Sequence, residues 1–284
     1  MKPAPFAYHR AHSVAEAVAL LAELGDEAKI LAGGLSLVPM MNFRLARPSA
    51  LVDVTPITGL SYLALDPEGG LRIGALTTHR TVETSRDPGV LAGFGVLPRS
   101  ARWIGHYPIR SRGTFGGSIA HSDPASEWCL LAMLLGARVV LTGPQGQRTV
   151  PVAEFFEGYY TTAAEPDEMI TELCFPEPAP RAVLAEFAQR QGDFAVVAAA
   201  VSVDIGDGVC RGGRVVLGGV GPLPMEVDTG ALAGQPAAPG TWQAMGEHAA
   251  SQIDPPEDTH GDAGFRRRLT ATLVSRALAE ASQL

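Results

Sequence analysis

Cysteine is scarce in this chain of 284 residues, which contains only Cys129, Cys174 and Cys210. None belongs to a CxxC pair, and an iron–sulfur cluster bound by thiolates requires four ligands. Isolated cysteines are typical of small buried apolar residues in a reducing compartment. We therefore expect no disulfide, no metal site within this chain and a cytoplasmic location.

Long hydrophobic runs are also lacking. The longest extends from Leu130 to Leu141, is interrupted by a glycine and an arginine, and is too short to span a bilayer. Residues 1–6 lack the apolar core of a secretory signal. The sequence therefore predicts no integral membrane segment.

Positive charge is in deficit, with 22 Lys and Arg residues against 30 Asp and Glu residues. Because binding to nucleic acid phosphates needs clustered basic side chains, the net charge of −8 argues against nucleic acid as the main partner. A short basic run, Arg266 to Arg268, falls in a predicted helix, and we expect it to line a solvated face.

The content of 46% hydrophobic and 18% charged residues is typical of folded domains, and the length permits two or more subdomains. Residue spacing predicts helices at 13–24, 88–103, 124–135, 242–252 and 265–282, strands at 29–32, 51–54, 71–76 and 169–175, and hairpins at 138–152 and 196–220. Alternating prolines at 176–180 cannot continue a helix or a central strand, so we expect a domain boundary near residue 178.

A first glycine segment, Ala32 to Leu37, follows one of the predicted strands. It matches neither GxGxxG nor GxxxxGK[ST], so neither a Rossmann dinucleotide site nor a P-loop is supported. Consecutive glycines permit positive φ and let successive backbone N–H groups point at one anion. The alternative is a tight turn that needs glycine for its geometry alone.

A second glycine segment extends from Arg112 to Ser118, about 80 residues after the first. It leads to Asp123, which is interpreted as the N-cap of a helix with Pro124 at its first position, and as a possible acceptor for a sugar hydroxyl. Arg110 and Arg112 either face a pyrophosphate or form an exposed surface pair. The two segments together indicate one diphosphate held from both sides.

Four motifs, in order along the chain, resemble the signatures of one family. The chain has AGGLSLVP at 32–39 followed by RLARP at 44–48, TTH at 77–79, IRSRGTFGGSIAHSDP at 109–124 and RQGDFA at 190–195. Their family counterparts are AGGxSLxP, TTH, IRxRGTxGGSxAHxDP and RxGDFA. The sequence is thereby similar to the FAD-binding medium subunit of molybdenum hydroxylases, the family of the carbon monoxide dehydrogenase medium subunit and the xanthine dehydrogenase FAD domain.

The resemblance implies an α+β fold in two parts. Residues 1–177 would form an FAD-binding domain of the vanillyl-alcohol-oxidase-like (PCMH) type, with subdomains at about 1–56 and 57–177. Residues 178–284 would form a C-terminal α+β domain like that of the carbon monoxide dehydrogenase flavoprotein.

The resemblance also implies roles for individual residues. The FAD pyrophosphate would be wrapped by Ala32, Gly33, Gly34, Leu35, Ser36 and Leu37. The rest of the implied cofactor site comprises Thr78, His79, Gly113, Thr114, Gly116, Gly117, Ser118, Asp123, Ile170 and Phe194. Asp123 would hold a ribityl or ribose hydroxyl, and Phe194 would lie beside the isoalloxazine, where relatives often carry Tyr. Leu35 replaces a common Gln, so one side-chain amide is lost.

The resemblance implies electron transfer through FAD to an external acceptor. The molybdenum cofactor and [2Fe–2S] clusters would lie on partner subunits, a large and a small one, in a dimer of heterotrimers. No residue of this chain is expected to act as nucleophile or general base. Two alternatives remain open: a self-contained FAD oxidase or dehydrogenase of the same fold class, and a non-catalytic nucleotide-binding protein.

Overall fold

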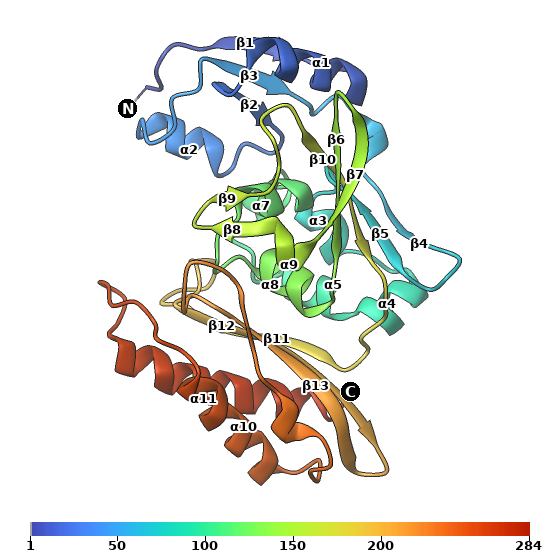
Figure 1. Cartoon of the computed structure of the whole chain (residues 1–284), viewed down its shortest axis with the longest axis vertical. Coiled ribbons are helices and arrows are strands. Elements are labelled where there is room, and N and C mark those ends of the chain that lie inside the picture. Colours follow the sequence, from blue (N-terminus) through green and yellow to red (C-terminus); the bar gives the residue numbers. More distant parts are fainter. Residues whose placement is uncertain (1) are drawn as a thin grey trace.

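The computed structural model describes residues 2–284, and within them the elements form three successive bodies along the long axis (Figure 1). The first body is a parallel sheet of order β1-β3-β2 with two helices. Its elements are β1 (Ala7–Arg10), α1 (Val14–Leu24), β2 (Ala28–Leu31), α2 (Leu37–Asn42) and β3 (Ala50–Asp53). Helix α1 begins as predicted, because the Ser13 side chain accepts a hydrogen bond from the Glu16 N–H at 3.1 Å.

The second body is an antiparallel sheet of order β4-β5-β10-β6-β7, with helices packed against it. The strands are β4 (Leu63–Leu65), β5 (Leu71–Gly74), β6 (Arg138–Gly143), β7 (Gly146–Pro151) and β10 (Met169–Phe175). The helices are α3 (His79–Glu83), α4 (Pro88–Phe94), α5 (Val96–Ala101), α6 (Tyr107–Arg110), α7 (Phe115–His121), α8 (Glu127–Leu134) and α9 (Val152–Phe155), and a short ribbon joins β8 (Phe156–Gly158) to β9 (Thr161–Thr162). Phe115 lies at the centre of the core, stacked on Trp128 at 4.5 Å.

The third body is an antiparallel sheet of order β11-β12-β13-β14, with α10 and α11 on one face (Figure 1). Its elements are β11 (Ala182–Phe187), β12 (Val197–Gly206), β13 (Val209–Gly218), β14 (Met225–Val227), α10 (Pro239–Ser251) and α11 (Ala263–Ala281). Strand β12 alternates between two cores: Val197 and Ala199 pack with the helices, whereas Ala198 and Ala200 join the core of the second body. Because successive side chains of a strand point to opposite faces of the sheet, β12 joins the third body to the second through the side chains on its second face.

The α+β class expected from the sequence is confirmed. Three local expectations are wrong. The second glycine segment is not a loop throughout, since α7 begins at Phe115, and α8 begins at Glu127 rather than Pro124. The stretch 88–103 contains two helices, α4 and α5. Within residues 2–284, no helix is both long and apolar enough to cross a membrane.

Candidate functional site

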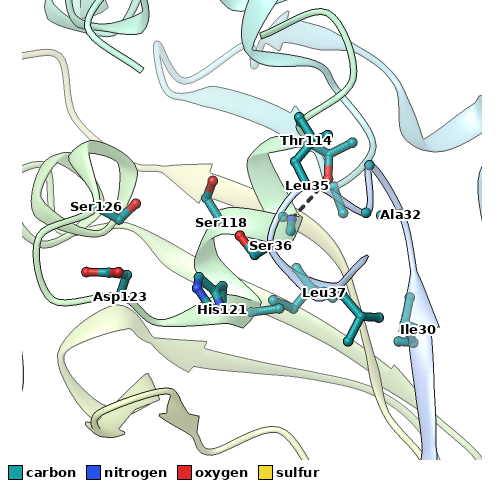
Figure 2. Close-up of a pocket in the computed structure, with 18 of the residues that line it drawn as sticks. Ile30, Ala32, Leu35, Ser36, Leu37, Thr114, Ser118, His121, Asp123 and Ser126 are labelled. Carbon is teal, nitrogen blue, oxygen red and sulfur yellow. Dashed lines mark hydrogen bonds between the residues drawn. The ribbon is translucent and has the colours of Figure 1, made fainter. Parts of the chain in front are cut away.

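A cavity of about 660 Å³ lies between the first two bodies, and the loop before β12 also borders it. This volume is typical of small-molecule and cofactor sites. Fifteen of the sixteen residues implied by the resemblance line it (several are shown in Figure 2): Ala32, Gly33, Gly34, Leu35, Ser36, Leu37, His79, Gly113, Thr114, Gly116, Gly117, Ser118, Asp123, Ile170 and Phe194. Thr78 instead lines an adjoining cavity of about 500 Å³.

The first glycine segment presents a row of free donors. Within residues 2–284, no protein acceptor receives a hydrogen bond from the backbone N–H groups of Gly33, Gly34, Leu35 or Ser36. Gly34 has φ +75°, a conformation that L side chains rarely adopt. Unpaired N–H groups at the wall of a cavity need an acceptor, and an anion such as a diphosphate supplies several oxygens. The geometry therefore favours the anion-binding interpretation over a turn alone.

The second glycine segment is different, because its N–H groups other than that of Thr114 already have partners among the described residues. The Thr114 hydroxyl caps α7 by accepting from the Gly117 N–H at 3.2 Å. The Phe115 and Gly116 N–H groups donate to the carbonyl oxygens of Thr77 and Ala75 at 2.8 and 2.9 Å. Glycine is needed at position 116 for close packing, since a Cβ atom would lie 2.6 Å from that of Ala75. This segment gives the cavity its shape and its hydroxyl groups.

Asp123 lies at the end of α7 in a turn, not at a helix N-cap. Its Oδ1 accepts from the Ala125 N–H at 2.9 Å, while the N-cap of α8 is Ser126. The carboxylate lines the cavity and also faces the Tyr160 hydroxyl. The preceding residue, Ser122, has φ +53°, so the turn stores some backbone strain.

Tyr160 also lines the cavity, although no sequence motif points to it. Its ring lies 4.9 Å from that of His121, and burial and the negative charge of Asp123 raise its pKa. Burial lowers the pKa of His121. Tyr160 comes from the ribbon between β8 and β9, nearly 40 residues after Asp123, so only the tertiary structure brings the three side chains together.

His79 is a buried neutral imidazole at the cavity wall. Its Nδ1 accepts from the Trp128 indole Nε1–H at 2.9 Å, and the residue is 3% exposed. Burial, with the charge of Arg110, lowers its pKa to about 4. Because Nδ1 is an acceptor, the ring proton is on Nε2, which is then a donor. The Thr78 side chain caps the N-terminus of α3.

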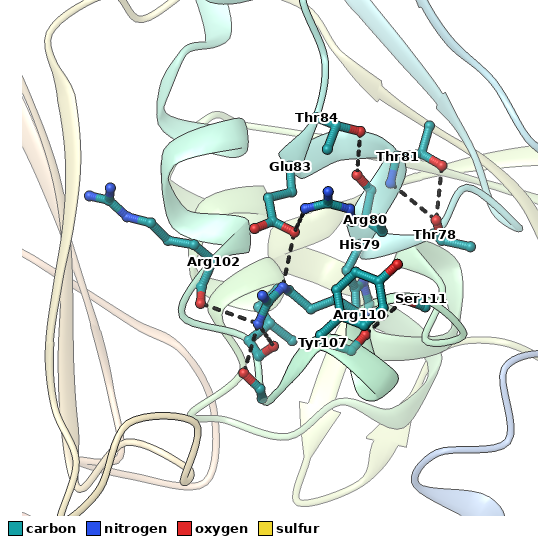
Figure 3. A network of polar contacts seen from close by, with 12 residues as sticks. Thr78, His79, Arg80, Thr81, Glu83, Thr84, Arg102, Tyr107, Arg110 and Ser111 are labelled. Carbon is teal, nitrogen blue, oxygen red and sulfur yellow. Dashed lines mark hydrogen bonds and ion pairs between the residues drawn. The ribbon is translucent and has the colours of Figure 1, made fainter.

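Arg110 belongs to a polar network beneath the second glycine segment (Figure 3). Glu83 accepts from Arg110 Nε and from Arg80 Nη1, both at 3.0 Å, and the Arg110 Nη1 donates to the Gly105 carbonyl oxygen at 2.9 Å. The two arginines lower the pKa of Glu83 although burial opposes them. Arg110 therefore fixes the chain that precedes the second glycine segment, and does not line the cavity.

Two neighbouring carboxyl groups, those of Glu127 and Glu186, carry raised pKa values. Burial, together with the charge of Glu186, raises the pKa of Glu127 to about 8. Burial raises the pKa of Glu186 to about 7, and its Oε2 has no hydrogen-bond partner in the part of the chain that the structure describes. Glu127 lines the cavity and is a protonated hydrogen-bond donor at neutral pH.

Strand β10 and the loop before β12 also border the cavity. Ile170 is 8% exposed, whereas Phe194 is 70% exposed at the cavity rim. Gly192 has φ +87°, and a Cβ atom there would lie 2.7 Å from the His106 imidazole. An exposed aromatic ring on a glycine-bent loop is suited to cover a flat ligand.

A cavity of this volume between two small α+β bodies, bordered by unpaired backbone N–H groups, is typical of a protein that binds a cofactor carrying a diphosphate. Residues 4–178 match the model of the FAD binding domain in molybdopterin dehydrogenase, and residues 182–281 match that of the CO dehydrogenase flavoprotein C-terminal domain. The chain belongs to the family of FAD-binding medium subunits of molybdenum hydroxylases, and is thus an oxidoreductase flavoprotein subunit.

Relatives match over nearly the whole chain. The chain is 36% identical to the carbon monoxide dehydrogenase medium chain of Hydrogenophaga pseudoflava, covering 98% of this chain and 97% of that one. It is also 36% identical to the 6-hydroxypseudooxynicotine dehydrogenase complex subunit alpha of Paenarthrobacter nicotinovorans, covering 99% and 96%. The solved structure of quinoline 2-oxidoreductase from Pseudomonas putida 86 superposes with a TM-score of 0.95 at 33% identity, covering 100% and 99%.

Proposed function

We propose that the cavity holds FAD with its diphosphate on the backbone N–H groups of residues 33–36. The observation that carries this placement is the row of four donors without a protein acceptor at the cavity wall. Gly34 has a positive φ, and backbone turns of this kind can direct successive N–H groups toward one anion. Ser36 adds a hydroxyl at the same wall.

The remaining lining residues border different parts of the cofactor. Thr114 and Ser118, with the close-packed Gly113, Gly116 and Gly117, border the ribityl–diphosphate region. The Asp123 carboxylate accepts from a ribityl or ribose hydroxyl, and Ile170 and Phe194 border the isoalloxazine. His79 donates from Nε2, and Ala32, Leu35 and Leu37 complete the apolar wall.

Bound FAD supplies the redox chemistry, passing electrons that arrive from iron–sulfur clusters on a partner subunit to an external acceptor. This chain's residues bind and orient the cofactor and exclude water from it. None is assigned as nucleophile or general base. The partners are a molybdenum-binding large subunit and a [2Fe–2S] small subunit, in a cytoplasmic dimer of heterotrimers. The chain is proposed to form two domains, residues 1–177 and residues 178–284. The first has subdomains at about 1–56 and 57–177.

The test is the visible spectrum of the purified chain, followed by identification of the ligand released on heating. We expect a yellow protein that releases intact FAD. Flavin-free chain should take up FAD at least about a hundredfold more tightly than riboflavin, because riboflavin lacks the diphosphate and loses two or more charged hydrogen bonds. A colourless chain that takes up no FAD, or one that binds riboflavin equally well, contradicts the proposal.

A further inference from the structure

A buried arginine of α11 holds the base of the loop that carries Phe194. Arg266 is 4% exposed, which corrects the expectation that the run 266–268 lines a solvated face. Its Nη1 donates to the carbonyl oxygens of Val196 and Gly219, the latter at 2.8 Å. Its Nη2 donates to Asp258 Oδ2 at 2.7 Å. Burying a charge is costly unless acceptors surround it, so these contacts fix the position of the guanidinium.

The loop itself spans residues 188–195, between β11 and β12. Its base is closed by the Val196 N–H, which donates to the Phe187 carbonyl oxygen at 2.8 Å. The Phe187 ring packs edge-on against that of Phe265, the residue before Arg266, at 5.9 Å and 85°. Residues 192–194 of the loop line the cavity. Helix α11 thus contacts both ends of a segment whose tip borders the cofactor site.

Gly219 allows the two carbonyl groups to meet one guanidinium. It has φ +73°, and a Cβ atom there would lie 2.4 Å from the Val196 carbonyl oxygen. Any larger residue would push the end of β13 away from Val196. The forked guanidinium can donate to two acceptors in fixed directions, whereas an ammonium group cannot reproduce that geometry.

We propose that Arg266 is a positioning residue: from the third body, it holds the 188–195 loop so that Phe194 covers the isoalloxazine end of the cavity. The proposal rests on the proposed function for the site of FAD, but the attachment of the loop to α11 does not. Arg266 touches no cavity residue directly. It acts through Val196, two residues after Phe194.

The attachment is tested by amide hydrogen exchange on the full chain without cofactor, comparing wild type, Arg266→Met, Arg266→Lys and a control, Arg267→Met. Arg267 is the adjacent residue and contacts Ile253 and Asp254 instead. Arg266→Met loses hydrogen bonds from a charged donor, so amide exchange at 188–196 should be faster by about tenfold or more. Arg266→Lys keeps the positive charge but not the forked geometry, so its exchange rate should stay closer to that of Arg266→Met than to that of wild type. Exchange in α10 should not change. Unchanged exchange at 188–196 in a folded Arg266→Met protein overturns the proposal.

The cofactor side is tested by iodide quenching of the fluorescence of bound FAD. Arg266→Met and Phe194→Ala should each increase quenching, and the double variant should show no further increase, because both remove the same cover. If Arg266→Met fails to fold, Gly219→Ala takes its place, because it disturbs the same contact from the residue after β13 and should likewise increase quenching. Additive effects, or unchanged quenching with a released loop, overturn the role of Arg266 at the cofactor. A wild-type chain without FAD instead contradicts the proposed function, while the exchange result still decides the attachment.

Discussion

A Cβ atom on Gly33 would lie 2.3 Å from the carbonyl oxygen of Arg112, so the backbones of the two glycine segments are in direct contact. The same Cβ atom would lie 2.9 Å from the Cα atom of Gly113. The glycine pair of the first segment therefore has two separate uses. Gly33 allows the segments to meet, and Gly34 permits the positive φ of a turn at the cavity wall.

Replacing Gly33 with Ala should abolish FAD retention. The added methyl group meets backbone atoms that cannot move aside as a flexible side chain would, so the first segment must shift away from the second. The measurement is the ratio of flavin to protein absorbance after purification. Gly240→Ala is the matched control, because a Cβ atom there meets nothing within 4 Å and φ is not positive. Full flavin content in a folded Gly33→Ala chain would show that the contact is not needed for the site.

Asp123 can be tested by two substitutions that separate its turn from its charge. Asn retains the Oδ1 acceptor for the Ala125 N–H, whereas Ala removes it. We expect Asp123→Asn to preserve the unfolding free energy and to weaken FAD binding, since an amide accepts less strongly than a carboxylate. Asp123→Ala should weaken binding and also cost about 1 kcal/mol of stability. Equal FAD affinity in all three chains would leave Asp123 with a structural role only.

Replacing Trp128 with Phe should destabilise the chain by about 1–3 kcal/mol, because His79 Nδ1 would lose its donor in a buried place. The control is Trp103→Phe at a half-buried position.

Because the pKa of His79 falls to about 4 in the native chain, the unfolded chain binds more protons between pH 6.5 and 4. The contribution of His79 to stability should therefore decline on acidification through this range, and in chemical denaturation the difference in unfolding free energy between wild type and His79→Phe should shrink as the pH is lowered.

The pair of Glu127 and Glu186 predicts the opposite dependence at higher pH. Their pKa values of about 8 and about 7 exceed the ordinary value near 4.5. The native chain therefore binds more protons than the unfolded chain in that interval, and stability should fall as the pH rises from about 4.5 to 8. Glu186→Gln mimics the protonated acid and should flatten this fall, whereas Glu177→Gln, at an exposed position, should not. An identical slope in Glu186→Gln and wild type would contradict the shift.

Two positions show where the residues nearby in the sequence predict the local structure and where they do not. The residues of the first glycine segment leave an anion site and a plain tight turn both open, and the structure favours the anion site because it leaves four N–H groups without a protein acceptor at a cavity wall. Asp123 was predicted as a helix cap because Asp-Pro favours a helix start, yet the helix begins at Glu127. In that case Ser122, in a left-handed conformation, ends α7 and starts a separate turn.

The sequence by itself determined the family, the fold class and the segments that line the cavity, because each depends on residues close together along the chain. Glycine pairs, capping residues and alternating apolar residues act over a few positions. Only the tertiary structure decided that Arg266 is buried against Val196, 70 residues away, and that Glu186 approaches Glu127. Burial and charge at those positions depend on which strand and helix pack together, and a basic run or an isolated glutamate carries no local sign of its eventual neighbours.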